Sequence, residues 1–139
     1  MAYTEKCQHC GHEIRAYIHK LNQPLVSALR QLVDRHEELR RSINLQKDLT
    51  LTKNQYNNFQ KLTYFGLIGH TTNGWYPTQH GIDFVYGRQS AWNRVATFRG
   101  KTVGFDHPVW LHSKVRPRAV LIREVDEVSY KQALDYTNQ

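Results

Sequence analysis

The stretch CQHCGHEIRAYIH, residues 7–19, contains both cysteines of the chain and three of its eight histidines. Cys7 and Cys10 have two residues between them, and a glycine follows. This is the form of a zinc knuckle, because paired thiolates bind Zn²⁺ and the glycine allows a tight turn around the metal. Structural zinc takes four ligands, and the chain has no third cysteine. We therefore expect histidines to complete the shell, and His12 and His19 are the nearest.

That four-residue set requires the chain to bend back between Ile14 and Ile18. His36, on the apolar face of the first predicted helix, is another candidate ligand, although a core histidine fits it better. Two other interpretations of the cysteine pair stay open: a redox pair, which would need a strand–helix setting, and a turn without metal. No HExxH pattern is present, so the zinc would be structural, a clip that fixes a strandless N-terminus onto the domain.

The bulk composition predicts one small domain without a membrane segment. The chain has 139 residues, of which 40% are hydrophobic and 12% aromatic, which is enough for a single core. No apolar run approaches the roughly 20 residues that span a bilayer, and the N-terminus has no signal-peptide core. We therefore expect a cytoplasmic protein, where cysteine pairs bind metal more often than they form structural disulfides.

Sequence motifs of enzymes are mostly missing. The chain has no glycine-rich phosphate loop and no Gly-x-Ser-x-Gly elbow. His107 and His112 lie near Asp106 and could serve as an acid–base site, but surface histidines in a basic region need no such role. We expect no enzymatic activity.

Positive charge is concentrated in the last third of the chain. The formal net charge is +7, and residues 88–123 carry eight basic residues against one acidic residue. Such a region is either a solvated basic face or a surface that binds a polyanion, since clustered cations gain from counterion release on nucleic acid. Charge alone does not decide between them.

Helical periodicity marks two segments. Residues 22–43 place apolar side chains at helical spacing, with Asn22 as the N-cap and Pro24 in the first turn. A short second helix is expected in NLQKDL, residues 44–49. Thr52 and Gln55 then have the spacing of a capping box for a helix over residues 53–65.

The predicted helix 53–65 has an unusual polar face. Its apolar stripe consists of Tyr56, Phe59, Leu62 and Phe65. The opposite face carries amides and lysines and no carboxylate, namely Lys53, Asn54, Asn57, Asn58 and Lys61. This face is either simply soluble or a recognition surface. Since asparagine is a mediocre helix former, two adjacent asparagines within a helix favour recognition.

A hairpin and several strands follow. Asn73-Gly74 is a strong turn signal between two apolar arms. Thr78 is expected to cap a brief helix, QHGIDFVY. The later segments RVATF, KTVGF, VWLH and AVLIREV are predicted strands, with a turn at Arg99-Gly100 and a terminal helix in SYKQALDYT.

The stretch NFQKLTYFGLIGHTTNGWYPTQHGIDFV resembles the recognition helix and wing of small bacterial and phage winged helix-turn-helix DNA-binding proteins. The matching pieces are an aromatic-Gly-Leu-Ile step at 65–68, the turn at 73–74, and a Thr-x-x-Gly motif at 78–81. The resemblance covers residues 22–87. It implies an α+β fold in three parts: a zinc knuckle over 1–21, a winged helix over 22–87, and a basic β-rich extension over 88–139.

The resemblance also implies a function. Helix 53–65 would lie in the major groove of double-stranded DNA, where Asn and Gln pair with adenine and Lys donates to guanine or phosphate, and the protein would be a transcriptional regulator. Thr72 and Asn73 at the wing tip would approach the DNA backbone or minor groove. Phosphate contacts, or the grip on a second segment, are assigned to Arg94, Arg99, Lys101, Arg116 and Arg118.

Two questions about partners stay open. A winged helix usually reads one half-site, which makes a homodimer plausible, with the first helix or the C-terminal strands as the interface. The alternative function is a zinc-stabilised winged-helix module that binds protein, such as a phage factor that occupies or inhibits a host protein through the basic strands.

Overall fold

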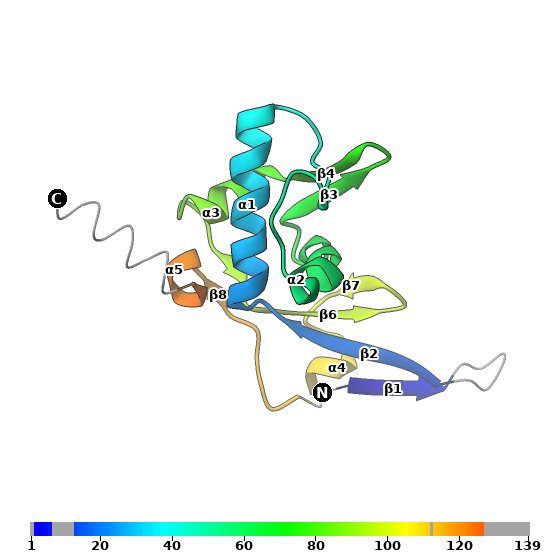
Figure 1. Ribbon diagram of the computed structural model, residues 1–139. Helices are drawn as coiled ribbons and strands as arrows, with labels where there is room; N and C mark the ends of the chain where they lie inside the picture. Colours follow the sequence, from blue (N-terminus) through cyan, green and yellow to red (C-terminus); the bar gives the residue numbers. More distant parts are fainter. Residues whose placement is uncertain (1, 7–12, 112, 127–139) are drawn as a thin grey trace.

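The computed structural model describes residues 2–6, 13–111 and 113–126 of this α+β protein. Within this part of the chain there are three small antiparallel sheets, one of four strands and two of two strands. The long helix α1 stands across the molecule, with the β3–β4 hairpin beside one end and the four-stranded sheet near the other, and α2 lies between hairpin and sheet (Figure 1). No helix among these residues is long and apolar enough to cross a membrane.

Helix α1 spans Gln23–Leu39, with the predicted start but an end before the predicted Ile43. Asn22 caps it by accepting a hydrogen bond from the Leu25 amide at 3.1 Å, and a proline occupies the first turn. Its buried side provides much of the main core through six residues, Leu25, Val26, Ala28, Leu29, Leu32 and Val33. The helix ends at Arg40, which adopts a left-handed conformation with φ of 53°.

The helix expected in residues 44–49 is wrong; this segment is a hydrogen-bonded turn. The Asn44 side chain accepts from the amides of Gln46 and Lys47 at 2.9 and 3.0 Å, and the Asp48 carboxylate accepts from the Asn44 amide at 2.9 Å. Short polar side chains that take backbone amides in this way compete with helix formation. Just before the turn, Ile43 forms an isolated β-bridge with Trp75.

The predicted helix 53–65 divides into two elements. Helix α2 spans Lys53–Asn58 and a 3₁₀ helix, η1, continues over Phe59–Thr63. The side chain of Asn58 donates back to the Asn54 carbonyl oxygen at 2.8 Å, which explains why the α-helix stops there. The 3₁₀ helix ends at Thr63, before the expected stop at Gly66, although Gly66 has the expected left-handed conformation, with φ of 75°. Of the predicted apolar stripe only Tyr56 is exposed, at 43%.

Strands β3 (Ile68–Thr71) and β4 (Gly74–Pro77) form the predicted hairpin. Its turn is shifted by one residue from the prediction, because Thr71 pairs with Gly74 and the loop consists of Thr72 and Asn73. Helix α3, Gln79–Val85, follows with the predicted cap, since Thr78 Oγ1 accepts from the Gly81 amide at 3.1 Å.

The N-terminal segment is not strandless, contrary to expectation. Strands β1 (Ala2–Lys6) and β2 (Glu13–Lys20) pair with each other, and β2 pairs with β6 (Arg94–Phe98), which pairs with β7 (Lys101–Val103). The sheet therefore joins the start of the chain to its last third. One face packs on Trp110 and Val109, and Val95 on the other face belongs to the main core. The turn at Arg99-Gly100 is confirmed, with φ of 55° and 76°.

Two of the predicted C-terminal strands are largely wrong. The first three residues of VWLH lie in helix α4, Pro108–Leu111, and AVLIREV begins as strand β8, Ala119–Val120, but continues as helix α5, Ile122–Val125. Strand β8 pairs with β5, Ala91–Trp92. These apolar runs are too short for periodicity to separate strand from helix. The predicted terminal helix in SYKQALDYT lies outside the described residues.

Gly81, the glycine of the Thr-x-x-Gly motif, allows helix α3 to pack directly against the backbone of Leu67. A Cβ at Gly81 would collide with the backbone carbonyl oxygen of Leu67, which cannot move without shifting the chain. We expect Gly81→Ala to lower the free energy of unfolding by about 1–3 kcal/mol, the usual cost of overpacking. Urea denaturation measures this loss, and Gln79→Ala on the exposed side of the same helix should stay within about 0.5 kcal/mol of wild type.

Candidate nucleic-acid interface

Helix α2 is held in place by one buried amide, that of Gln55. Gln55 Oε1 accepts from the Thr52 amide at 2.9 Å, and Thr52 Oγ1 accepts from the Gln55 amide at 3.1 Å, so the predicted capping box is present. Gln55 Nε2 also donates to the Pro24 carbonyl oxygen at 3.0 Å. The side chain is only 8% exposed. The start of α2 is therefore fixed to the start of α1.

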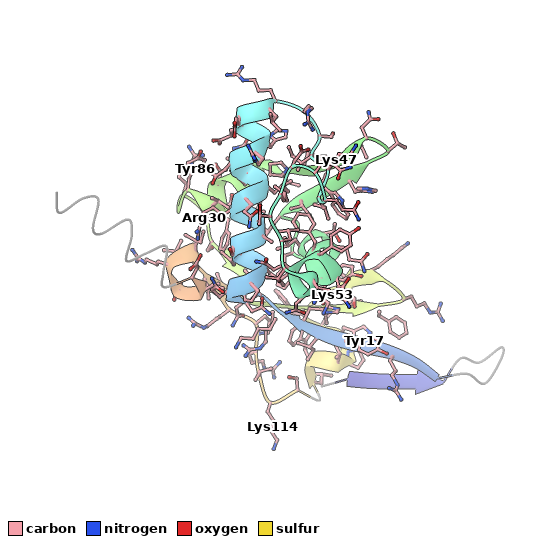
Figure 2. The ribbon with its side chains drawn as sticks, viewed as in Figure 1. Tyr17, Arg30, Lys47, Lys53, Tyr86 and Lys114 are labelled. Atoms are coloured by element: carbon pink, nitrogen blue, oxygen red, sulfur yellow. The ribbon has the colours of Figure 1, made fainter. Side chains whose placement is uncertain are left out.

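The amide and lysine face of α2 is divided between solvent and a groove. Lys53, Asn54 and Asn57 are exposed, whereas Asn58 and Lys61 are half-buried. Asn58 Nδ2 donates to both the carbonyl oxygen and Oδ1 of Asn54, each at 2.8 Å. Asn54 and Asn58 thus use part of their hydrogen-bonding capacity on each other. Lys53 and Asn57 are the residues of this face whose polar groups are directed to solvent. Figure 2 shows Lys53 on α2, above Tyr17 of strand β2.

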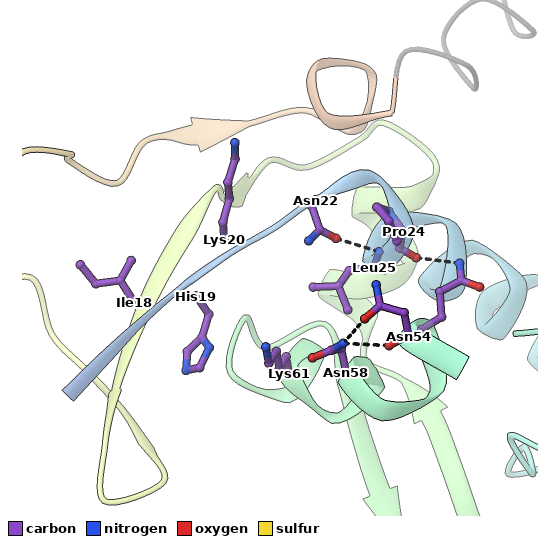
Figure 3. Close-up of a pocket in the computed structure, with 10 residues that line it drawn as sticks. Ile18, His19, Lys20, Asn22, Pro24, Leu25, Asn54, Asn58 and Lys61 are labelled. Atoms are coloured by element: carbon purple, nitrogen blue, oxygen red, sulfur yellow. Dashed lines mark hydrogen bonds between the residues drawn. The ribbon is translucent and has the colours of Figure 1, made fainter. Parts of the chain in front are cut away.

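A groove of about 250 Å³ separates α2 from β2, and we call it the α2 groove. Its polar lining comes from seven residues, His19, Lys20, Asn22, Asn54, Gln55, Asn58 and Lys61. None of the described residues that line it carries a carboxylate. Figure 3 shows His19 and Lys61 on its two sides, with the hydrogen bonds of Asn58 and Asn22 drawn. The groove therefore offers hydrogen-bond donors to an acceptor-rich or anionic ligand.

His19 lies against the α2 side of the sheet. Its Nε2 is 2.8 Å from Thr97 Oγ1, in a hydrogen bond between β2 and β6, and its ring centroid is 5.1 Å from that of Tyr64. Burial lowers the pKa of His19 below its ordinary value, and the nearby Lys61 ammonium lowers it further. The ring is therefore neutral near pH 7.

The tip of the β3–β4 hairpin stands on the other side of α2. Thr72 and Asn73 are exposed, and Thr71 Oγ1 accepts from the Asn73 amide at 3.2 Å. A second groove of about 250 Å³ runs between this tip, Tyr56 of α2 and the 44–48 turn. Exposed parts of α2 thus have a groove on each side.

The five predicted phosphate contacts do not form one surface. Arg99 and Lys101 lie in the β6–β7 turn, where the Arg99 guanidinium carbon is 5.5 Å from the centre of the Phe98 ring. Arg94 and Arg118 line a groove at the other end of β6. Arg116 is exposed in the segment before β8. The structure therefore brings Arg94 and Arg118 together from distant parts of the chain but separates them from Arg99 and Lys101.

His19 lies near the end of β2, whereas the other predicted zinc ligands precede the start of that strand. Strand β2 runs without interruption from Glu13 to Lys20, so the bend required between Ile14 and Ile18 does not exist. At about 3.3 Å per residue, His19 lies roughly 20 Å along the strand from Glu13. Cys7, Cys10 and His12 lie outside the described residues. Among the described residues no group of three or more His, Cys, Asp or Glu side chains could hold a metal ion.

Sequence reasoning missed two residues that shape this interface. Lys20 lines two grooves, and Tyr17 on β2 is 48% exposed. The signal was the alternation in EIRAYIHK, which places Tyr17 and His19 on one face of a strand and Ile18 and Lys20 on the other. Pairing with β6 then decides which face meets α2.

Comparison with known proteins identifies no relative. No protein-family model, no curated protein and no solved structure matches this chain.

The environment of His19 predicts how its titration responds to mutation. Replacing Lys61 with Met should raise the pKa of His19, while burial should still keep that pKa below its ordinary value. The unfolded chain protonates His19 near pH 6.5, and the folded chain only at lower pH. This group therefore makes folding less favourable as pH falls through that range. Titration of the His19 ring by NMR measures the shift, and Lys53→Met, if it moved the pKa equally, would contradict the assignment to Lys61.

Zinc binding by the cysteine pair stays a prediction, and the structure sharpens its test. We expect purified protein to contain about one zinc ion per chain and Cys10→Ser to lose it, since thiolate ligands hold structural zinc. Because His19 is hydrogen bonded to Thr97 at the far end of β2, His19→Ala should leave the zinc content unchanged and His12→Ala should lower it. Metal analysis of the three variants decides this, and an unchanged content in Cys10→Ser rejects the site.

Proposed function

We propose that this protein binds double-stranded DNA, places α2 in the major groove and acts as a transcriptional regulator. One observation carries the proposal: the carboxylate-free face of α2 is open to solvent at Lys53, Asn54 and Asn57, next to the exposed tip of the β3–β4 hairpin. A reading helix must stand clear of the core, and a protruding hairpin beside it can meet the sugar-phosphate backbone.

The order of elements supports a relation to winged helix-turn-helix proteins. Helix α1, helix α2 with η1, and the β3–β4 hairpin follow one another in the expected order. The turn at residues 44–48 takes the place of the middle helix of the expected three. The winged-helix relation therefore belongs to the proposal and rests on this order together with the sequence resemblance.

The chemistry of α2 favours base recognition over backbone contact alone. An asparagine side chain can pair at two points with the major-groove edge of adenine, and each such pair contributes about 1–3 kcal/mol of discrimination. Asn57 is exposed, so it is available for this contact. Asn54 and Asn58 would have to exchange their mutual hydrogen bonds for bonds to DNA, which lowers their net contribution.

A second function, protein binding, is favoured by an aromatic pair far from α2 in the sequence. Trp92 and Phe105 are each 43% exposed, and their ring centroids are 4.6 Å apart. Exposed aromatic residues are enriched where proteins meet. Binding that tolerates salt and requires Trp92 would support this second function over DNA recognition.

The DNA proposal predicts distinct effects of salt and of Asn57. The affinity for duplex should fall steeply as salt rises, because bound phosphates release counterions. At fixed salt, Asn57→Ala should weaken binding to the preferred sequence by about 5- to 150-fold, the equivalent of 1–3 kcal/mol, and bring it close to the affinity for random duplex. Selection from a random duplex library gives the preferred sequence, and fluorescence anisotropy measures both affinities.

Two controls make this test specific. Gln89→Ala removes another exposed amide, outside α2, and should change neither affinity. Equal affinity of the wild-type protein for all duplexes, unchanged by Asn57→Ala, would remove α2 as a reading helix.

A further inference from the structure

A further groove, beside the end of β2, is strongly basic, and the proposed reading of bases by α2 does not use it. It holds about 350 Å³, and we call it the basic groove. Its three cationic side chains come from distant parts of the chain: Lys20 at the end of β2, Arg94 at the start of β6, and Arg118 just before β8. Only the folded chain brings them together.

Two of these cations are forced into proximity by strand pairing. Lys20 and Arg94 are direct partners in the β2–β6 ladder, so their side chains leave the same face of the sheet with Cβ atoms about 5 Å apart. Like charges directly opposite each other destabilise a sheet. In the described part of the chain neither residue forms an ion pair with a carboxylate. Figure 3 shows Lys20 pointing away from His19 and toward the side of β8 and α5.

The backbone of Arg118 is fixed beside the groove, and the carboxylate in the groove lining does not neutralise its positive charge. Arg118 is tied to Asn93 by two bonds: its amide donates to Asn93 Oδ1 at 2.7 Å, and its carbonyl oxygen accepts from the Asn93 amide at 2.9 Å. Of the described residues lining the groove, Glu124 alone has a carboxylate. That carboxylate already accepts from the Leu121 amide at 2.7 Å and from Arg118 at 3.3 Å. The groove therefore keeps a net positive charge.

We propose that the basic groove binds a phosphate group. A guanidinium presents paired N–H donors that fit phosphate oxygens, and an ammonium adds a point charge. A phosphate seated between Lys20 and Arg94 converts their repulsion into two attractions. The groove volume leaves room for a phosphate with part of a sugar or another small group.

The phosphate has two sources, and the chemistry of the groove is common to both. It belongs either to a nucleic-acid backbone or to a free phosphate-bearing compound. Lys20 and Asn22 line the α2 groove as well as the basic groove, so a polyanion chain could pass from one to the other. The proposal does not depend on base reading by α2, because an anion site on this side of β2 stands with or without it.

The test compares two variants that each lose two positive charges. The groove variant, Lys20→Gln/Arg94→Gln, removes the two cations that lie opposite each other in the basic groove. Arg40→Gln/Lys114→Gln is the matched control, since both residues are exposed and neither lines the α2 groove, the groove at the hairpin tip or the basic groove. Removing the repulsion should raise the melting temperature of the groove variant by about 1–3 °C, and the control should not show this rise. Arg118→Gln is a further variant that leaves the β2–β6 pairing untouched.

Two binding measurements then identify the source. In the duplex measurement, the slope of log affinity against log salt should be smaller by about 1 in the groove variant than in the control. In the small-molecule measurement, inorganic phosphate at matched ionic strength with chloride should raise the melting temperature of the wild-type protein and the control more than that of the groove variant.

Each outcome is informative. A changed slope without a phosphate effect assigns the groove to backbone phosphate, and a phosphate effect with an unchanged slope assigns it to a free compound. Identical behaviour of the groove and control variants in both measurements would overturn the proposal. Asn57→Ala reports on sequence preference alone, so failure of base reading is distinguishable from failure of the phosphate site.

Discussion

The pairing of β2 with β6 is the contact on which both grooves depend. It joins residues near the start of the chain to residues of its last third, with Lys20 opposite Arg94 and Tyr17 opposite Thr97. Because side chains alternate along a strand, this register sends His19 toward α2 and Lys20 to the opposite face. A slip of one residue would exchange these faces. The burial of Ala16 beside Trp110 opposes such a slip, because a slip of β2 by one residue would turn Ala16 away from Trp110.

Helix α2 owes its position to buried polar contacts more than to its own length. A helix of six residues is far below the length at which isolated helices are stable in water. Its position is set by Gln55, which links the cap at Thr52 to the Pro24 carbonyl, and by Phe59 and Leu62 of the following 3₁₀ helix, both fully buried. Thr102 Oγ1 adds a bond from β7 to the Tyr64 carbonyl at 3.0 Å. The polar face is left open because all anchoring occurs on the opposite side.

Local signals in the sequence predicted those parts of the fold that local interactions determine. Asn22 and Pro24 fixed the start of α1, Thr52 with Gln55 fixed the start of α2, and Thr78 fixed the start of α3. The sequence could not predict that the amide and lysine face of α2 is divided between solvent and a groove. Strand β2 forms the other wall of that groove, and pairing with β6 determines where β2 lies. The hydrogen bond between His19 and Thr97 joins residues 78 positions apart. No window of neighbouring residues contains that information.

The energetics of a short reading helix also constrain how such a protein would reach useful affinity for DNA. Six residues at 1.5 Å each give α2 a length of about 9 Å, which spans the edges of only a few base pairs. With Asn57 as its freely exposed amide, base contacts would supply a few kcal/mol at about 1–3 kcal/mol each. Specific binding generally exceeds non-specific binding by about 4–10 kcal/mol. The contact made by Asn57 alone falls below that range. A regulator built on α2 would therefore need phosphate contacts from outside this helix, a second copy of the chain on an adjacent half-site, or both.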